Sequence, residues 1–490
     1  GVAIRVALCL FGLQPTLERV MELVVSSASW ERAREGLFLG TLGLSHYAGG
    51  AFSGSPLMLA AAWLCSRVPA GVQTLAATVL FSAFDVASGL LLRAICRRAV
   101  AVESGDWEAQ LEGWMDEESK PPSLKKSSSC LSTPHPDSGV AAEPKVDAPD
   151  THLAPTRDDA ASSTNSPGVS GPGGVAWNLP DVVLAVYLFN PVLAGQCAAL
   201  SGDVLGRVFP LAALVAAGSR RPGSTAAALA AATCLWRFYA APLILPAALM
   251  LGSSSLGDGE GSPVARGGGG KATSFDPRYF KLDTKAFLRL CVAFAAWCAV
   301  VLGVCWLGTS HSWAFLHAAV SGQLLCEDLT PNAGLYWYFF AELFPRFRGF
   351  FRVLFLSQPY VYILPATLRL GMFPEALASL LLAIFGLFHP YPTLADPMLA
   401  GCLFLCHPRT SARMRLVIPV GMIALIPALL LPTMRHVWLQ AGTGNANFYY
   451  FQTVILNVLL CVFVLQFAAA LVKRRKALRD AFERRRKSKA

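Results

Sequence analysis

The chain has 490 residues, of which 54% are hydrophobic and only 15% are charged, and its mean hydropathy is +0.48. Because a soluble domain carries about 25% charged residues, this composition excludes an ordinary soluble protein, and repeated apolar runs of about 20 residues indicate a polytopic membrane protein. The net charge of +10 does not indicate nucleic-acid binding, since much of it lies in one tail, from Lys473 to Lys489. Basic residues beside an apolar run are typical of a topology signal or of contact with anionic lipid.

The apolar runs are continuous and do not alternate with polar residues, which predicts helices. We therefore predict an all-α polytopic protein with about ten to twelve transmembrane helices. Most of the 13 cysteines lie inside apolar runs, where they behave as small hydrophobic residues. Cys402, Cys406 and His407 do not have zinc-site spacing, so we expect no metal and no other cofactor.

The N-terminal part, residues 1–99, contains the first predicted spans. Residues 1–13 are apolar and begin at Gly1 without Met, and we expect them to be a membrane helix shortened by truncation. A luminal loop is expected at 14–55, and it opens with an amphipathic stretch at helical spacing. Asp85 lies within a long apolar run. An acid at that depth is expected to face the bundle interior and to contact another helix.

The rest of the chain divides by composition and by the positions of its basic clusters. Pro, Ser, Asp and Glu dominate one segment and Gly and Ser another, and both patterns are typical of disorder or flexibility. The predicted parts are a disordered cytosolic insert at 100–178, transmembrane helices at 179–251, a flexible insert with a cytosolic lead-in at 252–285, a C-terminal transmembrane bundle at 286–473 with luminal loops 309–348 and 435–449, and a basic cytosolic tail at 474–490.

Positive-inside counting places four polar stretches on one side of the membrane. These stretches are 41–55, 321–348, 389–396 and 435–449. We therefore expect them to lie together at the luminal surface.

The stretch 321–348 joins an acidic pair, a turn and an aromatic block. The turn contains Asn332 and Gly334, which tolerate a positive φ. The aromatic block runs from Tyr336 to Phe340, and Trp and Tyr favour a membrane–water boundary. Two interpretations are open at this point: an aromatic belt on an interfacial loop, or a binding site for a lipid headgroup.

A membrane enzyme that acts on lipid-linked sugars needs a carboxylate in its first luminal loop, as a base or a metal ligand. This chain has no Asp or Glu between Glu35 and Asp85. His46 could act as a base there, but a lone loop histidine is more often a surface or packing residue. The adjacent Glu327 and Asp328 form a candidate acidic pair, although adjacent side chains diverge. Asn445 and Asn447, next to aromatic residues, suit polyols or phosphates, or they cap the last helix. These two interpretations stay equally open.

The stretch D-L-T-P-N-A-G-L-Y-W-Y-F-F-A-E-L-F (Asp328 to Phe344) closely resembles the pattern of the U subunit of GPI transamidase, the PIG-U family. Weaker stretches agree in the same order: W-E-R-A-R-E-G (Trp30 to Gly36), S-H-Y-A-G-G-A-F-S-G-S-P-L (Ser45 to Leu57), Y-P-T-L-A-D (Tyr391 to Asp396) and W-L-Q-A-G-T-G-N-A-N-F-Y-Y (Trp438 to Tyr450). The resemblance covers the chain apart from its two inserts.

The resemblance implies a subunit of the endoplasmic-reticulum complex that cleaves a C-terminal signal from a precursor protein and transfers the protein to glycosylphosphatidylinositol (GPI). It also implies a fold like that of the GT-C mannosyltransferases, and the missing first-loop acids imply a scaffold that binds the glycolipid without transferring sugar. The implied partners are a caspase-like catalytic subunit, subunits of the PIG-T, PIG-S and GAA types, the GPI glycolipid and membrane lipids, with no nucleic acid.

In the family, Asn447, with Asn445, and the long motif lie where the GPI core is presented. The residues that we expect to bind GPI or its lipid are His46, Tyr47, Asp328, Thr330, Asn332, Trp337, Tyr338, Glu342, Tyr391, Asp396, Asn445, Asn447, Phe448 and Tyr449. Two alternatives are kept. One is an active GT-C mannosyltransferase that uses dolichol-phosphate mannose and Glu327 or Asp328 as its acid. The other, which has less support, is a transporter with broken helices.

Overall fold

A computed structural model describes residues 2–50, 52–103, 178–252 and 283–489. Within these ranges the chain is helical, without strands, in agreement with the predicted all-α class. The greater part of the two predicted inserts, 100–178 and 252–285, lies outside the described residues.

The first part of the chain forms short helices followed by one long helix. They are α1 (Val2–Leu10), α2 (Gln14–Glu18), η1 (Ser26–Ala28), α3 (Trp30–Thr41), η2 (Ala48–Gly50), α4 (Pro56–Ser66), η3 (Ala70–Val72) and α5 (Gln73–Glu103). The predicted amphipathic stretch is interrupted between α2 and α3. The Glu18 carboxylate there accepts hydrogen bonds from the Ser29 hydroxyl (2.9 Å) and the Glu31 backbone N–H (2.7 Å), which ties the end of α2 to the start of α3.

The central part contains α7 (Leu179–Phe189), α8 (Pro191–Ala198), α9 (Gly202–Gly206), α10 (Val208–Gly218), α11 (Pro222–Leu235), η4 (Phe238–Leu243) and α12 (Ile244–Gly252). The C-terminal part contains α13 (Thr284–Gly308), α14 (Ala314–Gln323), α15 (Tyr336–Glu342), α16 (Pro345–Val361), α17 (Ile363–Leu370), α18 (Pro374–Leu387), α19 (Ala395–Leu405), α20 (Pro408–Ser411), α21 (Val417–Arg435), the π-helical η6 (His436–Gln440) and α22 (Ala446–Lys489).

Four helical segments in the described ranges are long and apolar enough to cross a membrane: Ala70–Glu103, Thr284–Gly308, Val417–Gln440 and Ala446–Ala481. The pair α7 and α8, bent by 51°, is a fifth if it counts as one span. This finding fits a multi-pass membrane protein. The larger predicted number of ten to twelve stays a prediction, since several other apolar helices, such as Pro374–Leu387, are only 10–17 residues long.

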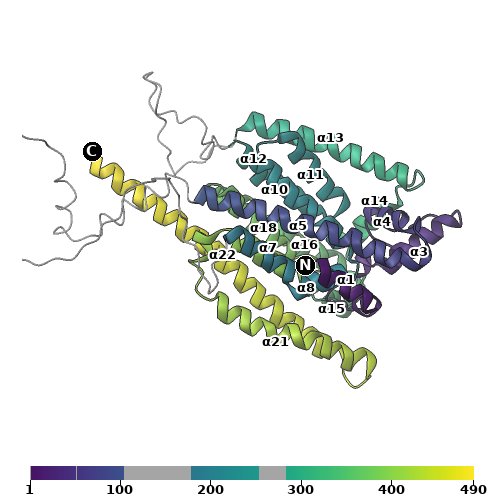
Figure 1. Cartoon of the computed structure of the whole chain (residues 1–490). Helices are drawn as coiled ribbons and strands as arrows, with labels where there is room; N and C mark the ends of the chain where they lie inside the picture. Colours follow the sequence, from purple (N-terminus) through teal and green to yellow (C-terminus); the bar gives the residue numbers. More distant parts are fainter. Residues whose placement is uncertain (1, 51, 104–177, 253–282, 490) are drawn as a thin grey trace, which may run out of the picture.

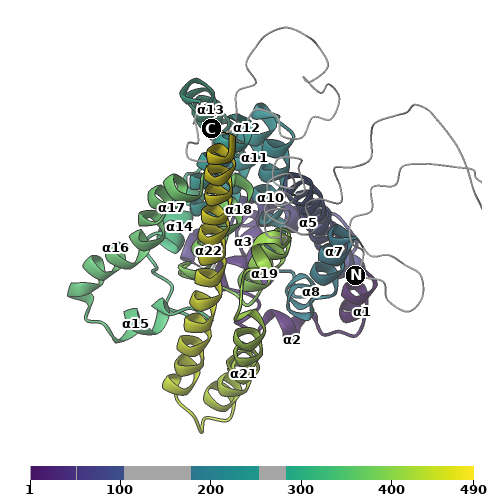
Figure 2. The ribbon, with the colours of Figure 1, turned by 90° about the vertical axis from the view of Figure 1, so that its left-hand side faces the viewer.

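The core is centred on α18, which packs against α12, α19 and α22. Eight consecutive residues of α18, from Ala376 to Ala383, are buried, so nearly every side of this helix contacts the bundle interior. The long α21 and α22 run side by side and are joined at one end, with α15 and α16 projecting nearby (Figure 2). On the opposite edge α13 lies along α11 and α12 (Figure 1).

Asp85 faces the bundle interior, as its position in an apolar run predicts. Its side chain is fully buried and accepts hydrogen bonds from Arg5 Nε (2.7 Å) and from the Tyr187 hydroxyl (2.6 Å). These partners lie on α1 and α7, so the acid joins three helices. The prediction of an inter-helix polar contact is confirmed.

Candidate functional site

Two of the four polar stretches meet in an aromatic cluster, defined here as Trp337, Tyr338, Trp438, Tyr449 and Tyr450. The Trp337 ring stacks on Trp438 with centroids 6.1 Å apart, and the Tyr338 ring stacks on Tyr450 at 4.4 Å. The cluster therefore fixes α15 of the stretch 321–348 against the turn that joins α21 and α22. Aromatic pairs of this geometry add about 0.5–1.5 kcal/mol beyond their burial.

The two asparagines at the start of α22 have different roles. The Asn445 side-chain oxygen accepts from the backbone N–H groups of Asn447 (3.1 Å) and Phe448 (3.3 Å), which is the geometry of a helix cap. The Asn447 side-chain oxygen accepts from the Tyr338 hydroxyl, and Asn447 is exposed. The capping interpretation is thus correct for Asn445, whereas Asn447 faces solvent at the rim of the cluster. Phe448 beside it is 56% exposed.

A buried ion pair lies under the aromatic cluster. Glu22, which is 1% exposed, contacts Arg435 with 3.4 Å between Oε1 and Nε. Burial raises the pKa of Glu22, and the charge of Arg435 opposes that shift. The Tyr449 hydroxyl lies beside the Glu22 carboxylate, whereas the buried Trp337 Nε1 has no hydrogen-bond partner among the described residues. The sequence analysis did not single out Glu22 or Arg435. The feature that could have identified them is a charged residue at the edge of an apolar run.

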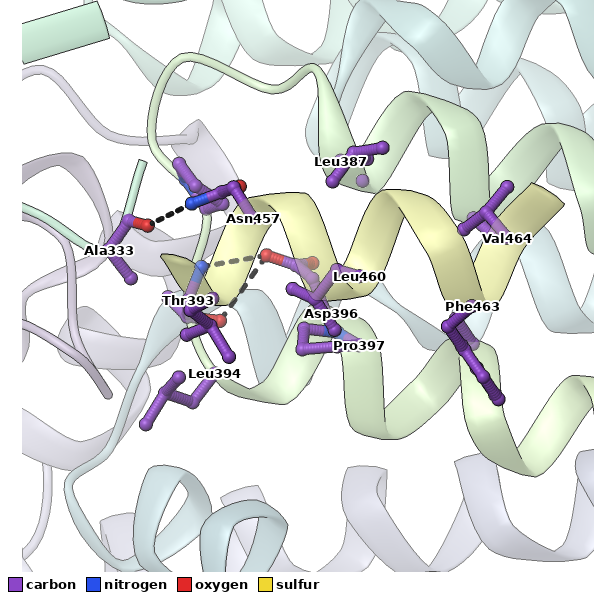
Figure 3. Close-up of a pocket in the computed structure, with 15 residues that line it drawn as sticks. Ala333, Leu387, Thr393, Leu394, Asp396, Pro397, Asn457, Leu460, Phe463 and Val464 are labelled. Atoms are coloured by element: carbon purple, nitrogen blue, oxygen red, sulfur yellow. Dashed lines mark hydrogen bonds between the residues drawn. The ribbon is translucent and has the colours of Figure 1, made fainter. Parts of the chain in front are cut away.

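The stretch 389–396 packs between the turn 330–334 and α22. Figure 3 shows the small cavity at this junction, where Asn457 donates to the Ala333 carbonyl (2.9 Å) and Thr393 donates its backbone N–H to Asp396 (2.9 Å). The cavity volume is about 30 Å³, which holds one or two waters at most. The polar stretches pack closely against each other at this junction, and the cavity between them is too small for a lipid headgroup.

Gly334 is required here for close approach. A Cβ at this position would lie 2.6 Å from Pro392 Cδ and 2.9 Å from Asn332 Oδ1. The turn does not use the tolerance of Asn332 and Gly334 for a positive φ, since neither residue has one and the nearest positive φ belongs to Cys326. The physical reason is that the missing side chain of Gly334 makes room for the 389–396 stretch, so the glycine is selected by packing.

The polar side chains of the turn bond mainly to the turn itself. Asp328 accepts from the backbone N–H of Thr330 (2.9 Å) and also from its hydroxyl. Asn332 is 3% exposed, donates to the Thr330 carbonyl (3.2 Å) and accepts from the Gly334 N–H (2.7 Å). Glu327 and Glu342 are exposed. Of the acidic pair, Asp328 therefore contacts its own turn and Glu327 faces solvent.

The first polar stretch packs against α3 and α4, away from the aromatic cluster. His46 Nδ1 lies 3.0 Å from the Gly36 carbonyl, and the Tyr47 hydroxyl donates to the Gly54 carbonyl at 3.3 Å. Tyr47 also contacts Phe52, which is 1% exposed. These contacts give His46 and Tyr47 a local structural role, and their predicted contact with glycolipid stays a prediction.

A larger cavity, of about 290 Å³, lies between this first stretch and the start of the 389–396 stretch. Arg237, which is 3% exposed and lines this cavity, forms ion pairs with Asp203 and Asp396, each at 2.9 Å. Tyr391 lines the cavity together with His389. Sequence reasoning selected Tyr391 and Asp396 but not Arg237, Asp203 or His389. An arginine inside an apolar run was the available signal, since it needs a buried partner.

Comparison with known proteins gives a consistent result. The family model described as "GPI transamidase subunit PIG-U" matches residues 1–456. The chain is 35% identical over 147 residues to the mouse (Mus musculus) protein named "GPI-anchor transamidase component PIGU", a match that covers 30% of this chain and 34% of that protein. It is 34% identical over 162 residues to the "GPI transamidase component GAB1 homolog" of Schizosaccharomyces pombe, covering 33% and 40%. The matched segments thus span about a third of the length of these relatives.

Proposed function

The chain belongs to the PIG-U family of GPI transamidase subunits, and on that premise we propose that it is a non-catalytic, multi-pass subunit that binds GPI and presents it for attachment to precursor proteins. The expected complex lies in the endoplasmic-reticulum membrane, with the basic tail of this chain in the cytosol. It contains a caspase-like catalytic subunit and subunits of the PIG-T, PIG-S and GAA types. The GT-C-like arrangement with ten to twelve spans and the domain boundaries given above belong to the same proposal.

The observation that carries the proposal is the contact between Tyr338 and Asn447 at the rim of the aromatic cluster. It combines a neutral amide, a hydroxyl and aromatic faces on an exposed edge. Such groups suit the hydroxyls and phosphates of a glycolipid core. Desolvation, and then the Glu342 carboxylate beside it, raise the pKa of Tyr338. The shift adds to the ordinary tyrosine pKa of about 10, so the hydroxyl is a donor at neutral pH.

The division of the acidic residues supports binding over sugar transfer. A mannosyltransferase needs a carboxylate held near the acceptor hydroxyl. Asp328 accepts hydrogen bonds within its own turn, Asp396 is paired with Arg237, and Glu327 and Glu342 are exposed. These engagements favour the non-catalytic function over the mannosyltransferase alternative.

The test is affinity purification of the full chain from membranes in mild detergent. We expect a caspase-like cysteine protease to co-purify, and mass spectrometry of the extracted lipids to detect bound GPI. Transfer of mannose from dolichol-phosphate mannose by the purified chain alone would instead establish the alternative. Absence of GPI from an intact purified complex would contradict the proposed binding.

A further inference from the structure

The 290 Å³ cavity, here called the Trp236 cavity, is lined by both polar and apolar residues. The polar lining includes Arg237, His389 and Tyr391. The apolar lining includes Leu302 of α13 and the Phe315–Leu316 pair of α14, and α13 is one of the segments long and apolar enough to cross a membrane. A cavity with both kinds of lining beside such a helix suits an amphiphile with a polar head and an apolar tail.

Two buried polar atoms on the residues of this cavity have no hydrogen-bond partner among the described residues: His389 Nε2 and Asp203 Oδ2. His389 is 7% exposed and Asp203 is 9% exposed. The Tyr391 hydroxyl, which is also buried, lies beside the backbone of Asp328. Leaving a buried polar group without a hydrogen bond is destabilising. Two such atoms around a single cavity indicate a ligand that completes their hydrogen bonds.

The hydrogen-bonding character of each atom follows from its other contacts. The Tyr391 backbone N–H donates to His389 Nδ1 at 3.1 Å, so the proton of the neutral ring is on Nε2, which is a donor. Burial, and then the charge of Arg237, hold the pKa of His389 well below its ordinary range, and the ring stays neutral. Asp203 Oδ2 is an acceptor, and the Tyr391 hydroxyl can donate or accept.

The charges around the cavity disfavour an anion. Arg237 donates to Asp203 Oδ1 and to Asp396 Oδ1, each at 2.9 Å, so one positive charge faces two carboxylates. A phosphate beside Asp203 Oδ2 would meet a like charge. Hydroxyl groups, in contrast, donate to a carboxylate and accept from an imidazole N–H. The Trp236 ring adds an apolar face to the cavity lining.

We propose that the Trp236 cavity binds the neutral, hydroxyl-rich glycosyl head of a membrane amphiphile. This site is separate from the aromatic cluster, with which it shares no residue, and it goes beyond the proposed function. His389 Nε2 and Asp203 Oδ2 hydrogen-bond to sugar hydroxyls together with the Tyr391 hydroxyl, and the Phe315–Leu316 pair contacts the start of the alkyl tail.

Photo-crosslinking of the full chain in phosphatidylcholine nanodiscs tests this proposal. The probe is octyl glucoside with a diazirine in its alkyl chain, and labelled peptides are identified by mass spectrometry. We expect labels on residues 315–323 that octyl glucoside competes away and that octyl phosphocholine, with the same tail, does not. Equal competition by the two detergents, or labelling confined to 438–450, would overturn the proposal. Equal competition by free glucose would overturn the assignment of an amphiphile and indicate a free sugar.

Two substitutions each remove a single polar group of the cavity. Tyr391→Phe deletes the hydroxyl, and His389→Asn keeps an acceptor for the Tyr391 N–H while deleting the Nε2 donor. Each is expected to weaken octyl glucoside competition about five- to tenfold, the effect of one hydrogen bond. Tyr360→Phe, on a 40% exposed tyrosine outside the cavity lining, is the matched control and is expected to bind as the wild type does. If His389→Asn does not fold, the result for Tyr391→Phe alone tests the site. Octyl glucoside competition in Tyr391→Phe as strong as in the wild type would reject the site.

Discussion

The Tyr338 hydroxyl donates a hydrogen bond to the Asn447 side chain across 109 positions of sequence. This contact joins α15 to the first turn of α22, and the ring of Tyr338 stacks on Tyr450 directly beside it. The polar rim and the aromatic wall of the candidate site are therefore built by the same two segments, and each can be altered separately.

Asn447→Ala is expected to reduce GPI anchoring several-fold while the complex still assembles. Asn447 is exposed, so its removal takes away a polar contact and leaves the packing of the aromatic cluster intact. Surface display of a GPI-anchored reporter in cells that depend on this chain measures anchoring, and co-immunoprecipitation measures assembly. Ser357→Ala, at an exposed serine of α16, is the control. Normal display with Asn447→Ala would reject the site.

Trp337→Ala is a test of packing more than of ligand contact. Trp337 is 4% exposed and is surrounded by Trp438, Tyr449 and Tyr450. Truncation of a buried Trp costs about 3–5 kcal/mol, so we expect a lower thermal unfolding temperature together with lost anchoring. A variant that loses anchoring at unchanged unfolding temperature would show that Trp337 contacts the ligand directly.

Asp85→Ala is expected to destabilise the chain by about 3–5 kcal/mol, because it leaves the buried Arg5 without its carboxylate. The matched control is Asp181→Ala, whose partner Arg93 is 31% exposed; a solvent-accessible pair contributes about 0–1 kcal/mol, so this half-buried pair is expected to contribute less than the fully buried one. Thermal unfolding of both variants in the same detergent compares the two pairs. Equal losses would mean that burial does not set the strength of the Asp85 contact.

The sequence predicted what depends on local pattern. Continuous apolar runs predicted helices, and the cost of a charge in an apolar medium predicted that Asp85 faces inward. Pairs of residues far apart in the chain, such as Glu22 with Arg435 or Arg237 with Asp396, could not be predicted, because nothing local specifies which helix ends meet. Gly334 shows the same limit: a turn sequence is compatible with a positive φ or with close approach, and only the position of Pro392 distinguishes the two.

Gly334→Ala is expected to destabilise the chain by about 1–3 kcal/mol, the usual cost of overpacking. The added methyl would meet the Pro392 ring at 2.6 Å. The double variant Gly334→Ala/Pro392→Ala should recover part of this loss, which a double-mutant cycle measures. Gly349→Ala, in α16 with nothing within 4 Å of its Cβ position, should instead stabilise by about 1 kcal/mol through helix propensity. If the effects of Gly334→Ala and Pro392→Ala are additive in the double variant, the steric explanation is excluded.

His407 is expected to make the chain less stable in mild acid. Its Nε2 lies 3.1 Å from the Ser379 hydroxyl, and its Nδ1 lies 3.9 Å from Glu103, which is already paired with Arg474. Burial, and then Arg474, lower the pKa of His407 from 6.5 to about 3.

Between these pKa values the unfolded chain binds one more proton than the folded chain, so stability falls as the pH drops below 6.5. At pH 5 the expected loss is about 2 kcal/mol, from about 1.4 kcal/mol per pH unit. Glu22, whose pKa is raised, acts in the opposite direction, so the informative quantity is the difference between the wild type and His407→Gln, in which the amide keeps the contact with Ser379. Thermal unfolding at pH 7.5 and pH 5 measures it, and an identical pH dependence of the two proteins would show that His407 does not titrate in this way.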